Sequence, residues 1–358
     1  MRSIGSPADW ITDERPRPLS RVGPVLALAM LFSAIVWLDA RSDAAPQQRF
    51  DGFNVIVSPG HPFGSPSASV ALANAKRLGA GTVAIIPFLW QSNPASPEIT
   101  RGADMDDGEL RAAIQAAHAL GLTVLVKPHV WVPQSWAGAI VMQSKADWEP
   151  WFANYQRELS RIARIAEEEK AEALAIGTEL SQSSLWPDWN DVIVNTRGIY
   201  SGRLLYIAHN VEEAETVPFW DRLDDIGVSL YPPLGGDDDR DYRQNTMRAI
   251  ADRLDALAAR NKKPIVVGEI GLRSAEGAAA KPWESAEERV SAPDPTLQAD
   301  VLADWLAALH RPAISGVLIW RWLTDPNAGG MTDTDFTVQG KPAEHVLMCA
   351  WTRSCKTG

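Results

Sequence analysis

Two glutamates occupy matching places in the sequence, each just after an apolar run that contains a glycine. Glu179 follows ALAIGT, and Glu269 follows PIVVG ninety residues later. Two carboxyl groups can carry out chemistry together when one keeps its proton and the other is ionised. A single glutamate after a strand is more often a charged loop residue, so the pair matters only if the fold brings both side chains together.

Eight short apolar segments have the composition of strands that are buried on both faces. They lie at 53–59, 82–88, 122–128, 172–177, 203–208, 225–230, 264–269 and 315–320. Amphipathic helical segments alternate with them, among them 145–169, 241–260 and a helix that Asp106 would cap. The alternation predicts an α/β fold, a closed (β/α)8 or TIM barrel. The alternative is an open doubly wound sheet, but SPGHPFGSP (58–66), after the first strand, lacks the expected G-x-G-x-x-G turn.

In such a barrel the functional residues lie at the carboxyl ends of the strands. Glu179 and Glu269 fall on strands four and seven, which face each other across the mouth. Glycoside hydrolysis needs such a pair, because one carboxyl group protonates the departing oxygen while the other attacks the anomeric carbon. We expect burial to raise the pKa of Glu179 and polar neighbours to keep Glu269 ionised.

Polar and aromatic residues also stand at most of the other strand ends. Tyr231 is placed to donate a hydrogen bond to Glu269, and we expect the tryptophans to stack on sugar rings, with core packing as the alternative for each. The predicted substrate-binding residues are Trp90, Lys127, His129, Trp131, Thr178, Asn210, Trp320 and Trp322.

Four motifs make residues 50–345 resemble the clan A glycoside hydrolases. These are KPH (127–129), GTEL (177–180), VGEIG (267–271) and IWRW (319–322) followed by DTDFTVQGKPA (333–343). Within the clan the chain looks most like glycoside hydrolase family 113, whose studied members act on β-1,4-mannans. The resemblance implies a retaining barrel enzyme with Glu179 as acid/base and Glu269 as nucleophile, and Tyr231 and Trp320 match a tyrosine and a tryptophan usual in the clan. Thr178 departs from the asparagine that usually binds the sugar 2-hydroxyl there, and Asn210 or His129 would have to supply that contact.

The N-terminus predicts export. Residues 1–21 form a polar leader with four arginines, 22–38 an uncharged apolar segment, 39–49 a linker, and 50–358 the hydrolase domain. The apolar segment is just long enough to span a bilayer, and the arginines before it predict a cytoplasmic N-terminus. We therefore expect an inner-membrane anchor with the barrel in a bacterial periplasm or at the cell surface. A secretion signal cleaved near Ala45 and a buried core helix are the alternatives.

The composition argues against several classes of partner and cofactor. The chain has 34 Lys and Arg against 45 Asp and Glu, a net charge of −11, which argues against a nucleic-acid partner. Six histidines without H-E-x-x-H or H-x-H spacing predict no catalytic metal, and no cofactor is expected. Cys349 and Cys355 match no zinc motif, but they could form a disulfide in an oxidising compartment.

The sequence therefore predicts a retaining hydrolase of a neutral β-linked polysaccharide, either β-mannan-like or an exopolysaccharide. Two alternatives stay open. Thr178 leaves room for a glycan-binding pseudoenzyme without turnover. The predicted anchor leaves room for a transglycosylase or a trimming partner of exopolysaccharide synthesis machinery.

Overall fold

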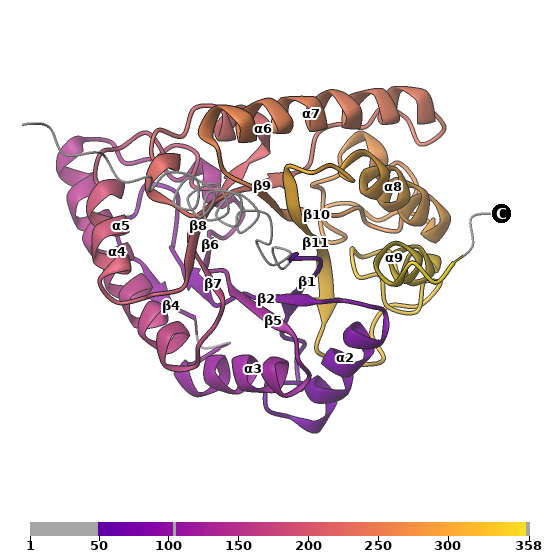
Figure 1. The fold of residues 1–358 in the computed structure, drawn as a ribbon, viewed down its shortest axis with the longest axis horizontal. Coiled ribbons are helices and arrows are strands. Elements are labelled where there is room, and N and C mark those ends of the chain that lie inside the picture. The colour runs from indigo at the N-terminus through magenta and orange to yellow at the C-terminus, as the bar shows by residue number, and fades with distance from the viewer. Residues whose placement is uncertain (1–48, 103–104, 356–358) are drawn as a thin grey trace, which may run out of the picture. The chain divides into compact units, whose positions relative to one another are not determined.

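The computed structural model describes residues 49–102 and 105–355, and its centre is a closed barrel of eight parallel strands (Figure 1). The strands follow one another around the barrel in the order β1-β11-β10-β9-β8-β7-β5-β2. Their bounds are Gly52–Ile56 (β1), Thr82–Ile85 (β2), Thr123–Val126 (β5), Ala173–Thr178 (β7), Arg203–His209 (β8), Asp225–Leu230 (β9), Ile265–Ile270 (β10) and Ile314–Leu323 (β11). All eight predicted strands are present, and the barrel prediction is confirmed.

The strands form because their residues are buried on both faces. Every residue of β2, β5, β7, β9 and β10 is buried. Alternate residues of a strand face opposite sides, and the apolar residues divide accordingly. A small cluster that includes Ala84, Leu125 and Ile207 fills the barrel. A much larger cluster lies between the barrel and the helices outside it.

The helices surround the strands, as Figure 1 shows. They are α2 (Pro66–Arg77), α3 (Asp107–Ala119), α4 (Lys145–Glu168), α5 (Trp189–Arg197), α6 (Asn210–Ala214), α7 (Arg240–Asn261), α8 (Pro295–Ala308) and α9 (Pro342–Thr352). The predicted cap of α3 is confirmed, because Asp106 Oδ1 accepts a hydrogen bond from the Glu109 amide at 2.8 Å. The predicted helices at 145–169 and 241–260 correspond to α4 and α7.

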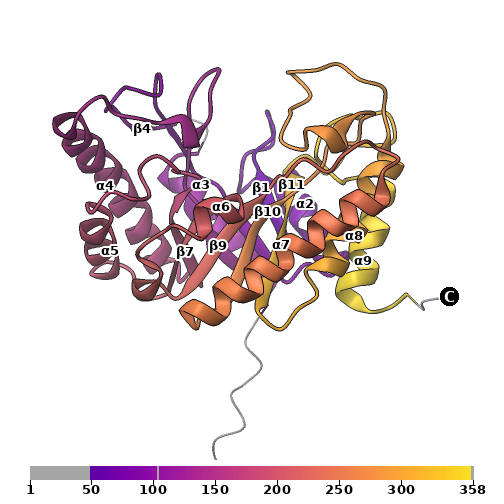
Figure 2. The same cartoon turned by 90° about the horizontal axis from the view of Figure 1, so that it is seen from above.

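A small second sheet extends the barrel at the carboxyl ends of two strands. It joins β4 (Thr100–Arg101), β3 (Phe88–Trp90) and β6 (His129–Trp131) in that order. Since β3 follows β2 and β6 follows β5 after two residues each, this sheet lies on the carboxyl side of the barrel. In Figure 2, β4 is on the same side as the long segment between β10 and α8. The sequence did not predict this sheet.

The predicted anchor at 22–38 lies outside the described residues, as do the leader 1–21 and nearly all of the linker. Among the residues that the structure describes, no helix is long and apolar enough to cross a membrane. The anchor stays a prediction.

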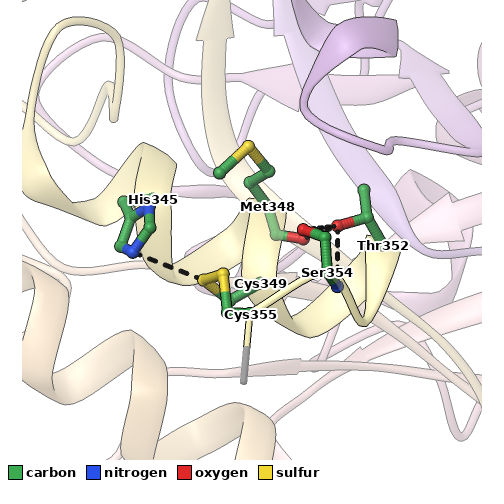
Figure 3. Close-up of a disulfide and its surroundings, with 6 residues drawn as sticks. All are labelled: His345, Met348, Cys349, Thr352, Ser354 and Cys355. Atoms are coloured by element: carbon green, nitrogen blue, oxygen red, sulfur yellow. Dashed lines mark hydrogen bonds between the residues drawn. A yellow bond between two sulfur atoms is a disulfide. The ribbon is translucent and has the colours of Figure 1, made fainter. Parts of the chain in front are cut away.

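Cys349 and Cys355 are joined in a disulfide that ties the last turn of α9 to the chain beyond it (Figure 3). The Thr352 hydroxyl donates to the Met348 carbonyl at 2.7 Å within the same turn. The bond that the sequence left open is therefore formed.

Candidate active site

Glu179 and Glu269 both lie at the mouth of the barrel. Glu269 is part of β10 and is 4% exposed. Glu179 follows β7 directly, and its amide donates to the Ile207 carbonyl at 2.7 Å. The charges of both carboxylates affect the pKa of the same neighbouring side chain, Tyr231. Burial raises the pKa of Tyr231 well above its ordinary value, and the charges of both glutamates add to that effect.

Glu269 is held by two side chains that directly follow other strands of the barrel, Lys127 after β5 and Tyr231 after β9. Lys127 Nζ donates to Glu269 Oε1 and also to Asn54 Oδ1, the latter at 2.7 Å. The Tyr231 hydroxyl donates to Glu269 Oε2 at 3.0 Å, as the sequence predicted. Asn54 Nδ2 donates to the Gly268 carbonyl at 3.0 Å, which ties β1 to the backbone beside Glu269. Both carboxylate oxygens are thus occupied, and the group is fixed in one orientation.

Glu179 has a different environment. Its Oε1 lies 3.1 Å from His209 Nδ1, and the His209 ring packs against Trp136 with 4.6 Å between ring centroids. Burial by itself raises the pKa of Glu179, but the hydrogen bond from His209 and the positive charges of His209, His129 and Lys127 together outweigh it, and the pKa is lowered. The expectation of a raised pKa is therefore wrong, because the sequence did not show His209 beside this carboxylate.

A third carboxylate, Glu213, fixes the two segments that carry Glu179 and His209. Its oxygens accept from the Ser181 hydroxyl at 2.6 Å, the Tyr206 hydroxyl at 2.6 Å and the His209 amide at 2.7 Å. Burial raises the pKa of Glu213. Since all three donors point at one side chain, Glu213 links the segment after β7 to the end of β8.

Three of the predicted tryptophans, Trp90, Trp131 and Trp320, lie near the mouth and are partly exposed. Trp131 is 48% exposed, and its ring centroid is 6.1 Å from that of Trp90 in the small sheet. Trp320 is half-buried near the end of β11, with Lys127 Nζ 5.5 Å from its ring centroid. These rings are available as flat surfaces for sugar units.

His129 and Asn210 both lie at the mouth, but only one of them is uncommitted. His129 Nδ1 is buried without a hydrogen-bond partner, and burial lowers the pKa of this histidine, which favours a neutral ring. Asn210 is engaged with protein atoms at both ends of its amide. Its Oδ1 accepts from the Tyr231 amide at 2.8 Å, and its Nδ2 lies 3.0 Å from His209 Nε2.

The prediction for Trp322 is wrong. This side chain is 1% exposed, its Nε1 donates to the Ala71 carbonyl at 3.0 Å, and its ring packs on Phe53. Asn54 pairs with Trp320 but Val55 pairs with Trp322, so the register shifts by one residue between them. A shift of one residue exchanges the two faces of a strand, and Trp322 therefore points into the helix layer.

The assignments of Lys127 and Thr178 to substrate binding are also wrong. Lys127 is fully buried, and its contacts are Glu269 and Asn54. Thr178 is 1% exposed, and its hydroxyl donates to the Pro128 carbonyl at 3.0 Å. Both side chains are buried beneath the site and bind protein atoms, so neither is accessible to a substrate.

Sequence reasoning missed Asn54, His209 and Trp136 as site residues. Asn54 had a usable signal, because it is a polar residue inside the apolar run GFNVIV. His209 stands at the end of the predicted fifth strand, beside Asn210, and could have been chosen on the same ground. Trp136 lies in a segment without periodicity, and nothing in the sequence singled it out.

Within residues 49–102 and 105–355, His345, Cys349 and Cys355 are the one group of three potential metal ligands that lie close together. His345 Nε2 is 3.5 Å from Cys349 Sγ (Figure 3). Because the two sulfurs are bonded to each other, they offer no thiolate to a metal.

A parallel barrel with two glutamates at its mouth, one buried and one partly exposed, defines a class, the barrel glycoside hydrolases. The chain matches the sequence profile of Glycoside Hydrolase Family 113 over residues 54–341. It belongs to that family and is a glycoside hydrolase. No curated protein matches the sequence.

Solved structures agree with this assignment. The chain is similar to the family 113 β-mannanase AaManA from Alicyclobacillus acidocaldarius in complex with ManMIm, with 25% identity over 86% of this chain and 98% of that one and a TM-score of 0.77. It is also similar to another structure described as a family 113 β-1,4-mannanase, with 27% identity over 85% of this chain and 99% of that one and a TM-score of 0.76. A β-glucuronidase from Ruminococcus gnavus, 14% identical over 85% of this chain and 50% of that one with a TM-score of 0.59, shares the fold alone.

Proposed function

We propose that the protein is a retaining endo-β-1,4-mannanase that works by double displacement. The carrying observation is the pair of glutamates at the barrel mouth, each with its own set of partners, in a chain that matches β-1,4-mannanases along nearly their whole length. The sugar comes from those relatives, and the chemistry comes from the site.

Glu269 is the nucleophile in this proposal. Lys127 and Tyr231 occupy its two oxygens and hold the carboxylate in one orientation. Attack on the anomeric carbon forms a glycosyl–enzyme ester as the bond to the leaving oxygen breaks. Orientation is the main requirement of that step, because a reacting atom must be held close to its target and in line with the bond that breaks.

Glu179 is the acid/base. It protonates the leaving oxygen in the first half of the reaction and takes a proton from the attacking water in the second. Its side chain is 12% exposed, so one of its edges is open to the mouth. No side chain other than His209 donates a hydrogen bond to Glu179 among the described residues.

Action within a polymer fits the distribution of aromatic residues. Trp131, in the small sheet, is 48% exposed, and Trp136, beside His209, is 43% exposed. A polysaccharide that crosses the mouth would stack several sugar units on such rings, whereas an enzyme that trims chain ends needs only the first one or two.

The test exposes β-mannan, glucomannan, mixed-linkage β-glucan and chitosan to the purified protein, with Glu269→Gln as control. We expect oligosaccharides from β-mannan with the wild type and none with the variant. The anomer formed first distinguishes the stereochemistry, because a retaining enzyme releases the β form before mutarotation. An α anomer at early times would exclude double displacement.

The absence of products from all four polymers, with the fold intact, would contradict a mannanase. It would leave a hydrolase of a dedicated exopolysaccharide or a glycan-binding pseudoenzyme. Binding of β-mannan without cleavage would identify the pseudoenzyme.

We also propose that the barrel is exported and anchored in the inner membrane. The Cys349–Cys355 disulfide supports export, since such bonds persist in oxidising compartments. Membrane fractions of the source cell should release the full-length chain with detergent but not with alkaline carbonate. A shorter, freely soluble chain that starts after Ala45 would indicate a cleaved signal instead.

A further inference from the structure

We propose that a directional hydrogen-bond chain, from the Tyr231 amide through Asn210 and His209 to Glu179, fixes which oxygen of Glu179 carries the catalytic proton. His209 is then a positioning residue, locked as the neutral ring with its hydrogen on Nδ1. The inference rests on the proposed role of Glu179 as acid/base and adds the device that prepares it for both halves of the reaction.

The direction of the chain follows from its first member. The Tyr231 backbone amide can only donate, and it donates to Asn210 Oδ1 at 2.8 Å. This contact orients the amide, so Asn210 Nδ2 faces His209 Nε2 at 3.0 Å. Because an amide nitrogen has hydrogens and no free acceptor, His209 Nε2 must accept.

The tautomer of His209 follows from that contact. A neutral imidazole has one donor and one acceptor nitrogen, so a ring whose Nε2 accepts carries its hydrogen on Nδ1. His209 Nδ1 lies 3.1 Å from Glu179 Oε1 and donates to it. Protonation of Nε2 would place two N–H groups against each other.

The charged groups around His209 act against this lock. Burial lowers the pKa of His209, but the carboxylates of Glu179, Glu213 and Glu269 favour the imidazolium form and together raise it. Burial and the Asn210 amide oppose the charged form, and the Trp136 ring covers one side of the imidazole. The tautomer lock requires that the hydrogen bond from Asn210 prevails.

The two oxygens of Glu179 then have different tasks. Oε1 always accepts from His209, whether the carboxyl group is protonated or not. Oε2, which has no hydrogen-bond partner among the described residues, carries the proton. In the first half-reaction the Oε2 proton passes to the glycosidic oxygen as its bond to the anomeric carbon breaks. In the second, Oε2 takes a proton from the water whose oxygen attacks that carbon, and His209 keeps the same protons throughout.

The backbone makes Asn210 hard to replace. Its φ is +56°, in the left-handed region that asparagine and aspartate tolerate better than most residues. Asn210→Asp therefore suits this backbone and changes only the chemistry. An aspartate still accepts from the Tyr231 amide, but it presents an acceptor to His209 Nε2 and so favours the imidazolium.

The experiment is a ¹⁵N NMR titration of the six histidines in the full chain, with His209→Gln to assign the His209 signals. In the wild type we expect one protonated and one unprotonated nitrogen, Nδ1 and Nε2, unchanged from pH 6 to 8. In Asn210→Asp we expect both nitrogens to be protonated at pH 7. A wild-type His209 with both nitrogens protonated at pH 7, or with the hydrogen on Nε2, would overturn the proposal.

Kinetics give a second readout on β-mannan oligosaccharides. In Asn210→Asp the imidazolium stabilises the Glu179 carboxylate, so the alkaline limb of the kcat/KM profile should move to lower pH. His209→Gln should lower kcat by about 10²-fold, a size typical of a misplaced catalytic group, with little change in KM. If Asn210→Asp lowered kcat/KM equally at every pH and left the alkaline limb of the profile in place, the result would contradict the tautomer lock.

His118→Gln is the matched control. His118 also pairs with a carboxylate, Glu172, at 3.3 Å, but on the outer helix α3. It should change neither the limb nor the His209 signals. The NMR result does not depend on turnover, so an inactive wild type would remove the proposed function and leave the tautomer lock to be judged by its spectra.

Discussion

Glu269 and Glu179 lie at the same barrel mouth and differ in how they are held. Glu269 lies within a strand, and both of its oxygens have donors from residues that directly follow other strands of the barrel. Glu179 follows its strand at a left-handed φ of +54° and has one side-chain partner. The first arrangement fixes a charge in place, and the second leaves one oxygen free to gain and lose a proton. Two glutamates can thus serve as nucleophile and as acid/base because the hydrogen-bond partners at their strand ends differ.

The largest effect is expected at Glu269. Glu269→Gln removes the nucleophile, and kcat on β-mannan should fall by at least about 10⁴-fold, as for other nucleophile deletions. Glutamine is the better variant because it can still accept from Lys127. Glu269→Ala would leave that buried ammonium with Asn54 alone, and unfolding in urea should show this as a further loss of stability. Residual activity above one per cent in Glu269→Gln would contradict the assignment.

Glu179→Ala should lower turnover of mannan by about 10²- to 10⁴-fold, the usual contribution of a general acid. The loss should shrink for aryl mannosides whose leaving group needs no proton. Added azide should restore turnover and yield the glycosyl azide. A loss that is equal for good and poor leaving groups would mean that Glu179 does not protonate the leaving oxygen.

Lys127→Met tests how Glu269 is held in place. It leaves Glu269 buried without its cation, and the free energy of unfolding should fall by about 3–5 kcal/mol, as for other broken buried pairs. The kcat should fall as well, because Glu269 loses the donor on Oε1. Lys341→Met is the control away from the two glutamates, since the Lys341 side chain is also fully buried but pairs with Asp333, which is 31% exposed, at 2.6 Å. It should lose less stability, because water can solvate the Asp333 carboxylate, and it should keep a larger share of kcat.

The sequence predicted those parts of the molecule that depend on burial along one segment. Eight apolar runs predicted eight strands because both faces of a barrel strand are buried. The small sheet was missed because β3, β4 and β6 have two or three residues each, too few for a period to show. The two glutamates were found because strand ends in a barrel converge on one face.

Contacts that cross the barrel could not be predicted in the same way. Lys127 was assigned to substrate binding because it stands at the end of the third predicted strand. Its contact with Glu269 depends on the distance between two strands, which the sequence does not give. The pKa of Glu179 was predicted in the wrong direction because His209 comes from the neighbouring strand. Trp322 was assigned to the mouth because it stands with Trp320 at the end of the predicted eighth strand, and only the pairing with β1 shows the shift of register.

The smallest expected effect belongs to Trp131, outside both carboxylate environments. Trp131→Ala should raise KM for β-mannan by about 2- to 12-fold, the range that corresponds to a stacking contribution of about 0.5–1.5 kcal/mol. The melting temperature should stay the same, because the ring is 48% exposed. Trp131→Phe keeps a flat ring and should recover most of the affinity. We expect a short aryl mannoside not to reach the small sheet, so its KM should not change in either variant. If KM rose equally for the aryl mannoside and the polymer, Trp131 would act on the carboxylates and not on a distant sugar unit, and the comparison between the two glutamates would have to include it.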